Sequence, residues 1–284
     1  MTVNNEIRNA FNQHAHQYEQ FARVQQEIGT RLLERLDYLK QTPKRILDLG
    51  CGSGYFSEQL RQRYPQAEIM GLDLSSKMLQ EAKKRQQSGA TWSLTQADLL
   101  QLPFDHGVFD LIFANQVIHW ASSLPRVFRE MNRVMSHEGC LMFTTLGPDT
   151  FMELRRAFFA ADPYAHVNDF VDLHVLGDGL LSELFLDPVV DMAFLTAHYP
   201  SVRALLSSLK AQGVRNIHQQ RNRGLTGRQS WGVFLDHMET FVTPQGHYPL
   251  TYEVIYGHAW KGALHRHEQG TQAIIPLSKI QKFK

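Results

Sequence analysis

Three glycines at alternate positions are the first feature of this sequence that could do chemistry. Gly50, Gly52 and Gly54 follow a short apolar run that contains Asp48, in the stretch LDLGCGSG at residues 47–54. A strand that enters a glycine turn and then a helix brings backbone N–H groups and a helix amino terminus close to a ligand. Many glycine turns only pack a strand against a helix, so the loop alone leaves both interpretations open.

An acid further along the chain indicates the kind of ligand. Asp73 ends the next apolar run about 20 residues after Gly54, where an acid commonly accepts hydrogen bonds from ribose hydroxyls. The glycine spacing G-x-G-x-G differs from the dinucleotide fingerprint G-x-G-x-x-G, which makes NAD the weaker candidate. The pattern therefore favours a nucleoside ligand that is not a dinucleotide.

Repeated βα units are predicted to position these residues. Apolar residues at three- and four-residue steps from Phe11 to Leu39 have the period of an amphipathic helix, and Pro43 marks its end. Seven apolar or β-rich runs are predicted to be strands, at 45–50, 68–75, 91–98, 109–116, 139–147, 187–199 and 248–260. Segments of helical length separate the first five, which is typical of a parallel sheet. Helical stretches at 150–161 and 201–213 are expected as insertions.

The bulk composition limits the class of protein. The chain has 284 residues, 43% of them hydrophobic, which is enough for one large core. The net charge of +1 argues against a general nucleic-acid-binding protein. Two cysteines are too few for a disulfide framework, and the amino terminus lacks the apolar core of a signal peptide. Since no apolar stretch approaches the roughly 20 residues that cross a bilayer, we expect a cytoplasmic protein with neither a nucleic-acid nor a membrane partner.

Three motifs follow one another along the chain: the glycine loop, Asp73, and Asp98 in QADLLQLPF. In their order they resemble the three motifs of the class I methyltransferases. The resemblance implies an α/β, Rossmann-like fold with a seven-strand mixed sheet, an N-terminal helical lid and an inserted helical cap. It implies S-adenosyl-L-methionine as methyl donor and S-adenosyl-L-homocysteine as product, with the glycine loop at the methionine part, Asp73 at the ribose and Asp98 at the adenine amino group. The expected cofactor-binding residues are Asp48, Gly50, Cys51, Gly52, Gly54, Asp73, Leu74, Asp98, Leu99 and Asn115.

Flanking stretches resemble a narrower family, the malonyl-carrier-protein O-methyltransferases of biotin synthesis. The stretches are AFNQHAHQYEQFARVQQ, HWASSLPRVFREMNRVMSHEG, FTTLGPDTFMELRRAF, SVRALLSSLKAQGV and YPLTYEVIYGHAW. The resemblance implies methylation of the free carboxylate of a malonyl thioester, which lets fatty-acid elongation accept the group. The expected partner is a malonyl acyl carrier protein, with malonyl-CoA left open.

This reaction needs positioning more than a catalytic base. The sulfonium methyl group is activated by its charge, and a malonyl carboxylate is ionised because carboxylic acids titrate around pH 4. The sequence has no Ser/His/Asp set and no Cys/His metal cluster, so we assign no certain catalytic residue and no metal. His119 could serve as a base, but we expect a packed histidine at the edge of a pocket. The candidates for positioning the substrate are Tyr18, Arg155, Arg156 and Lys210.

Positive charge is concentrated in one part of the chain. The stretch from Met192 to Leu235 has no Asp or Glu but contains Arg203, Lys210, Arg215, Arg221, Arg223 and Arg228. Such a region suits the electrostatic steering of an acidic carrier protein. A basic surface without a partner is the alternative.

One methyltransferase domain is expected over residues 1–262. It divides into the lid (1–42), the donor-binding core (43–147), late core elements with insertions that face substrate or carrier (148–247) and the last strand (248–262). The tail at 263–284 has no strong pattern, and we expect that it frays. Two other functions stay open on the sequence alone: methylation of another small carboxylic acid or a quinone precursor, and donor binding without catalysis.

Overall fold

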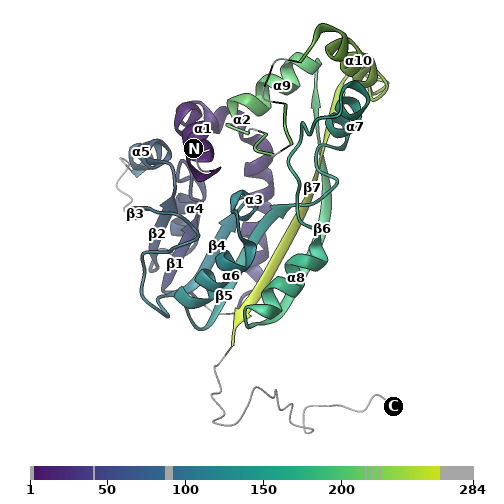
Figure 1. Cartoon of the computed structure of the whole chain (residues 1–284). Coiled ribbons are helices and arrows are strands. Elements are labelled where there is room, and N and C mark those ends of the chain that lie inside the picture. The colour runs from purple at the N-terminus through teal and green to yellow at the C-terminus, as the bar shows by residue number, and fades with distance from the viewer. Residues whose placement is uncertain are drawn as a thin grey trace, which may run out of the picture.

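A seven-strand mixed sheet forms the centre of the molecule. The computed structural model describes residues 3–40, 42–86, 92–214, 216–218, 220–222, 224 and 226–262. The strands are β1 (Arg45–Leu49), β2 (Glu68–Asp73), β3 (Ser93–Gln96), β4 (Phe109–Asn115), β5 (Met135–Leu146), β6 (Phe185–Tyr199) and β7 (Tyr248–Lys261). They lie in the order β3-β2-β1-β4-β5-β7-β6 (Figure 1). Neighbours among β1–β5 pair in parallel, and β7 pairs antiparallel with both β5 and β6.

The predicted strands and the seven-strand mixed sheet are confirmed, since each of the seven predicted runs overlaps one strand. The first strand, β1, shows why the apolar runs predicted strands. Ile46, Leu47 and Leu49 are fully buried, as expected for a central parallel strand that is covered on both faces.

The first forty residues differ from the prediction of one amphipathic helix. They form α1 (Val3–His14), α2 (Tyr18–Phe21), α3 (Arg23–Arg35) and the short 3-10 helix η1 (Leu36–Tyr38). The helical period holds within the pieces, but a single helix is wrong because α1 and α3 pack in different places. The Asn12 side-chain oxygen accepts hydrogen bonds from Ser75 Oγ (2.7 Å) and Lys77 N (3.2 Å), so α1 is held beyond the end of β2. Ile28 and Leu32 of α3 are instead buried in the core.

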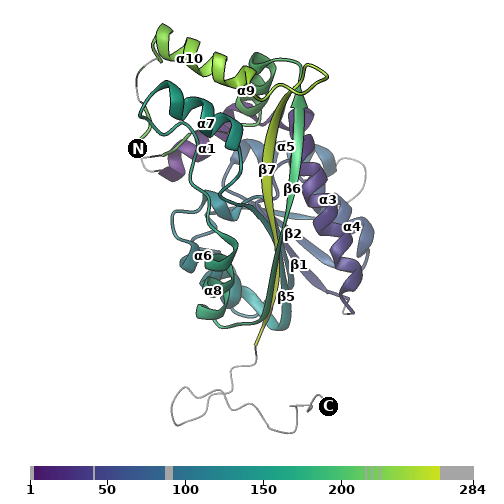
Figure 2. The ribbon, with the colours of Figure 1, turned by 90° about the vertical axis from the view of Figure 1, so that its right-hand side faces the viewer.

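Helices cover both faces of the sheet. After the N-terminal helices, the described chain forms the helices α4 (Tyr55–Arg63), α5 (Ser76–Arg85), η3 (Ile118–Trp120), α6 (Leu124–Val134), α7 (Met152–Ala161), α8 (Leu173–Ser182), α9 (Val202–Ala211) and α10 (Arg228–Glu239). In Figure 2, α3 and α4 lie on one side of the sheet and α6 and α8 on the other. Ile28 and Phe56 belong to one buried cluster, and Phe128 and Leu180 belong to a second. The sheet lies between these clusters. Because both of its faces are covered, a ligand-binding site is expected at the ends of its strands.

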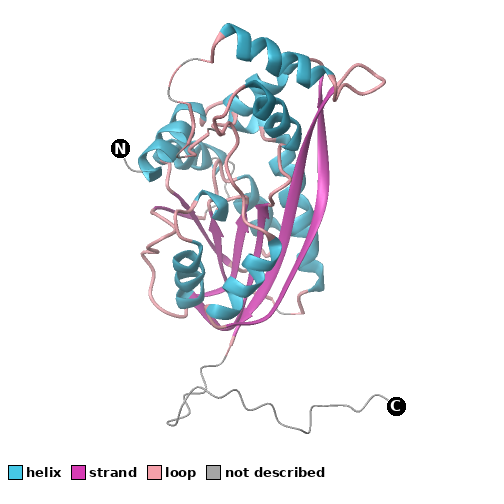
Figure 3. Ribbon diagram, turned by 45° about the vertical axis from the view of Figure 1, so that its right-hand side comes forward, coloured by secondary structure: helices cyan, strands magenta, loops and turns pink. Residues whose placement is uncertain are grey.

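The elements after β5 extend the molecule at one end. Figure 3 shows β6 and β7 running past the parallel strands toward the helices at that end. The predicted helical stretches at 150–161 and 201–213 are confirmed as α7 and α9. Ser201 caps α9, since its hydroxyl accepts a hydrogen bond from Ala204 N at 3.1 Å. The tail expected at 263–284 lies outside the described residues. No described helix has the length and apolar character needed to cross a membrane.

Candidate active site

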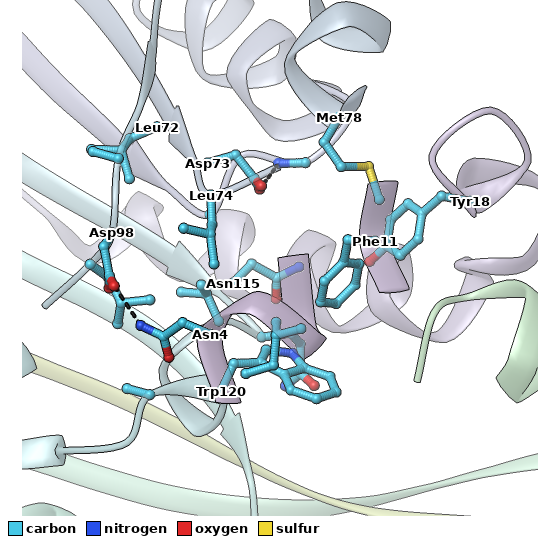
Figure 4. Close-up of a pocket in the computed structure, with 18 residues that line it drawn as sticks. Asn4, Phe11, Tyr18, Leu72, Asp73, Leu74, Met78, Asp98, Asn115 and Trp120 are labelled. Carbon is cyan, nitrogen blue, oxygen red and sulfur yellow. Dashed lines mark hydrogen bonds between the residues drawn. The ribbon is translucent and has the colours of Figure 1, made fainter. Parts of the chain in front are cut away.

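A pocket lies where the carboxyl ends of β1, β2, β3 and β4 meet. The order of the sheet reverses between β1 and β4, and in open α/β sheets ligands bind in the crevice at such a point. The pocket contains about 750 Å³ of space, part of it open to solvent. In Figure 4, Asp73 and Asp98 lie on one side of this pocket, and Phe11, Tyr18 and Trp120 close the other. We call this the first pocket.

The three loop glycines have three different surroundings, although all have positive φ. A Cβ on Gly50 would lie 2.5 Å from a methyl group of Val117, and one on Gly54 would lie 3.0 Å from Ala82 and 3.2 Å from Trp92. Nothing lies within 4 Å of a Cβ built on Gly52, which lines the pocket. Close packing therefore explains two glycines, and only Gly52 leaves open the space that a ligand would fill.

Asp73 joins the glycine loop to the end of β2. Its carboxylate accepts hydrogen bonds from Gly52 N at 3.0 Å and Ser75 N at 2.7 Å. Burial raises the pKa of Asp73 to about 6, although these backbone hydrogen bonds act in the opposite direction. Each carboxylate oxygen has a second lone pair, so Asp73 can still accept hydrogen bonds from a ligand.

Asp98 lies on the same side of the pocket as Asp73, just after β3. Its Oδ1 accepts a hydrogen bond from Leu100 N at 2.9 Å, and its Oδ2 accepts one from the side-chain amide of Asn4 at 2.5 Å. Figure 4 shows this bond between the lid helix α1 and the core. An amide NH₂ group thus already occupies the carboxylate that the resemblance assigned to the adenine amino group.

Asp48, Cys51 and Gly54 belong to the loop or to the strand before it, but they do not line the first pocket. Asp48 accepts a hydrogen bond from the Ser57 hydroxyl at 2.5 Å, and burial raises its pKa to about 7. Burial also raises the pKa of the Cys51 thiol. These three residues order the turn, whereas the other expected cofactor-binding residues, Gly50, Gly52, Asp73, Leu74, Asp98, Leu99 and Asn115, all line the pocket.

The lid closes the first pocket with aromatic rings. Phe11 packs edge-on against Trp120, with ring centroids 5.4 Å apart, and against Tyr18 at 6.3 Å. Burial raises the pKa of the Tyr18 hydroxyl, and the negative charge of Asp73 raises it further. Tyr18 is therefore a neutral hydrogen-bond donor.

A second pocket lies directly beyond these rings. It contains about 510 Å³ of space and shares Phe11, Tyr18, Gln116 and Trp120 with the first. Its other polar side chains include three carboxamides and a histidine, at Gln25, Asn168, Gln212 and His119. Burial lowers the pKa of His119 to about 3, so the ring is neutral at physiological pH. Neither pocket has a Lys or Arg among the described residues that line it.

The cations among the predicted positioning residues lie elsewhere. Arg155 lies 3.6 Å from the Asp169 carboxylate and donates a hydrogen bond to the Asn168 carbonyl at 3.2 Å. Arg156 is exposed, and Lys210 lines a separate groove. Of the four candidates, only Tyr18 lines both pockets, and the positioning role of all four stays a prediction.

The described arginines of the basic stretch 192–235 have different surroundings. Arg203 and Arg228 are exposed, whereas Arg221 pairs with Glu6 of the lid at 2.9 Å. Arg215 and Arg223 lie outside the described residues, so the structure does not test a continuous basic surface.

Several wall residues were missed by the sequence analysis. Asn4, Gln25, Gln116 and Gln212 carry no motif, and elements far apart in the chain bring them together. Gln116 alone has a local peculiarity, a φ of 56° in a residue other than glycine. Elsewhere in the described ranges, no group of three or more His, Cys, Asp or Glu side chains is arranged to hold a metal ion.

Comparisons with known proteins agree with this architecture. Residues 47–143 match a family model described as a methyltransferase domain. A malonyl-[acyl-carrier protein] O-methyltransferase of Legionella pneumophila is 58% identical over 99% of this chain and 99% of its own length. A protein of the same name from Gallionella capsiferriformans is 40% identical over 97% of both chains. Among solved structures, the YcgJ protein of Bacillus subtilis has a similar fold, with a TM-score of 0.58, 18% identity and coverage of 82% of this chain and 99% of that one.

Proposed function

Because this chain belongs to the malonyl-[acyl-carrier protein] O-methyltransferase family, we propose that it methylates the free carboxylate of a malonyl group carried by an acyl carrier protein. The enzyme is an O-methyltransferase that uses S-adenosyl-L-methionine. The methyl ester would then enter biotin synthesis, as the family resemblance implies. The observation that carries the proposal is the shared wall of the two pockets, since a methyl transfer needs two substrates side by side.

The first pocket fits the methyl donor. S-adenosyl-L-methionine supplies an electrophilic methyl group when it is bound. The open space at Gly52 accommodates the close approach of a ligand to the backbone, and we propose that Gly50 and Gly52 lie along the methionine part. Asp73 would accept hydrogen bonds from the ribose hydroxyls. Asp98 would accept one from the adenine amino group, which requires Asn4 to share the carboxylate or to move aside.

The second pocket would hold the malonyl carboxylate. Tyr18 and Gln116 lie on the shared wall, where their neutral donors can orient one carboxylate oxygen toward the donor. A neutral donor leaves that oxygen more nucleophilic than a bound arginine would. No base is required, which agrees with the neutral His119.

The apolar walls contribute through water exclusion. In the proposed step, a carboxylate oxygen would form a bond to the methyl carbon while the bond from that carbon to the sulfonium sulfur breaks, with the electron pair going to sulfur. The carboxylate and the sulfonium would both lose their charge, so removal of water destabilises the separated ions more than it destabilises the transition state. Phe11 and Trp120 pack together at the junction, and we propose that their rings keep water away from the reacting atoms.

A methyl-transfer assay tests the proposal. The purified chain is incubated with methyl-labelled S-adenosyl-L-methionine and malonyl carrier protein, and label is measured in a base-labile methyl ester. Acetyl carrier protein is the matched control, since it has the same thioester but no free carboxylate. Malonyl-CoA and free malonate are run in parallel to define the acceptor. The proposal predicts label on malonyl carrier protein and none on acetyl carrier protein; label on both, or on neither, would contradict it.

A further inference from the structure

A groove that is partly open to solvent adjoins the second pocket. It contains about 1050 Å³ of space and is lined by residues of α7 and α9 and by Val214, Asn216, Arg221, Asn222, Gly224 and Thr226. Phe151, Asn168, Phe170 and Val214 line both this groove and the second pocket. In Figure 1, α7 and α9 lie at the same end of the molecule as the lid helix α1. The first pocket, the second pocket and the groove therefore adjoin one another in that order, since each shares wall residues with the next.

We propose that the groove holds the phosphopantetheine arm of the malonyl thioester, with the phosphate of the arm at Lys210. This inference rests on the proposed function, because only a thioester substrate carries such an arm. The arm is an aliphatic chain with two amides that ends in a phosphate, and it is shared by carrier-protein and CoA thioesters.

The walls of the groove suit such a chain. Leu206, Phe158 and Val167 provide apolar surface, and Asn168 and Asn216 place carboxamides among them. The Asn216 amide donates a hydrogen bond to Ala165 O at 2.6 Å and its oxygen accepts one from His218 N at 2.9 Å, so this side chain is held in place. Phe158 is likewise fixed, because it stacks on His166 with ring centroids 3.9 Å apart. A fixed, mostly apolar wall with a few polar groups is typical of a ligand site.

The distribution of charge matches the two anions of the substrate. The pockets where the carboxylate would react have no Lys or Arg on their described walls, whereas the groove has Lys210 and Arg221. Arg221 is already paired with Glu6 at 2.9 Å. No described acidic side chain lies within ion-pair distance of Lys210, which is exposed in the last turn of α9. Among the described residues that line the groove, Lys210 is thus the cation available to a phosphate.

The first experiment compares Lys210→Gln with Arg203→Gln. Arg203 is an exposed cation at the other end of α9 and does not line the groove, so its substitution removes the same charge from the same helix. The substrates are malonyl carrier protein, malonyl-CoA and malonyl-pantetheine, which lacks the phosphate. Lys210→Gln is expected to raise KM about three- to fivefold for both phosphate-bearing substrates, the range of an exposed ion pair. It should not change KM for malonyl-pantetheine, and Arg203→Gln should change KM for neither malonyl-CoA nor malonyl-pantetheine.

A second variant tests the path of the arm. Thr226 lines the groove but neither pocket and is half-buried in a loop, so Thr226→Trp adds bulk with little disturbance of the core. It is expected to lower kcat/KM about tenfold or more for the three pantetheine substrates, while binding of S-adenosyl-L-homocysteine and the Tm stay unchanged. Malonyl-N-acetylcysteamine, in which most of the arm is missing, should be affected less.

The results separate failure of the inference from failure of the proposed function. If the wild-type enzyme methylates no malonyl thioester, the proposed function is wrong. If the wild type is active and Lys210→Gln affects only malonyl carrier protein, Lys210 contacts the surface of the carrier and the inference is overturned. Equal effects of Lys210→Gln on malonyl-pantetheine and malonyl-CoA, or no effect on any substrate, would also overturn it.

Discussion

Replacing Asp73 with asparagine should weaken binding of the methyl donor by at least about tenfold. The change is nearly isosteric, but it removes the negative charge that we propose accepts hydrogen bonds from the ribose. A hydrogen bond to a charged acceptor contributes about 1.5–3 kcal/mol, which corresponds to roughly a tenfold to hundredfold change in Kd. Asp73 also accepts hydrogen bonds from Gly52 N and Ser75 N, so an amide NH₂ group facing either of them would loosen the loop and add to the loss.

The raised pKa of Asp73 gives this prediction a second signature. A ribose hydroxyl donates to the ionised carboxylate, so binding favours the ionised form and donor affinity should fall as the pH drops through about 6. At pH 5, one unit below a pKa of about 6, roughly one Asp73 side chain in ten is ionised in the free enzyme. We therefore expect S-adenosyl-L-homocysteine to bind up to about tenfold more weakly at pH 5 than at pH 8.

Isothermal titration calorimetry with S-adenosyl-L-homocysteine between pH 5 and 8 measures both effects. Asp110→Asn is the matched control, because Asp110 lies at the other end of β4 and accepts hydrogen bonds from Lys44 N and Arg45 N. The control should keep wild-type affinity and the wild-type pH dependence, whereas Asp73→Asn should bind weakly at every pH with a flatter profile. Unchanged affinity in Asp73→Asn, or the same decline at low pH in that variant, would refute the role of Asp73.

Three further predictions follow from the loop, the lid and the buried acid. Gly52→Val should abolish donor binding because its side chain would fill the open space at this position. Gly246→Val is the control, because Gly246 also has positive φ and open space at its Cβ position but does not line the first pocket, so this variant should bind S-adenosyl-L-homocysteine normally in calorimetry. Tyr18→Phe keeps the ring but removes the hydroxyl, so kcat/KM for malonyl carrier protein should fall about tenfold at unchanged Tm; equal activity would leave Tyr18 a packing residue. For Asp48, whose pKa is raised to about 7, the folded state holds the proton more tightly than the unfolded state does, so its stabilising contribution is complete below the ordinary pKa and is lost as the pH rises through about 7. Asp48→Asn should therefore be more stable relative to wild type at pH 8 than at pH 5, and a stability difference in urea unfolding that does not vary with pH would contradict this.

Local features made much of the fold readable. Strands such as β1 are buried on both faces and read as continuous apolar runs, and turn and helix patterns separate them, so their number and positions follow from residues close together in the chain. The N-terminal helices show the limit of this reasoning. The apolar period continues from α1 to α3, but the direction of the chain changes at α2 because α1 is bonded to Ser75 and Lys77 beyond the sheet.

The motifs by themselves predicted a nucleoside-binding glycine loop and two acids in this chain, since each depends on residue type and spacing. Only the tertiary structure decided which of these groups face the pocket. Gly50 and Gly52 are two residues apart, yet Val117 fills the space at one and nothing fills it at the other. Asn4 bonds to Asp98 across 94 positions, and the carboxamides of the second pocket come from helices and loops without any shared pattern. Such contacts depend on how distant segments pack, which no local spacing specifies.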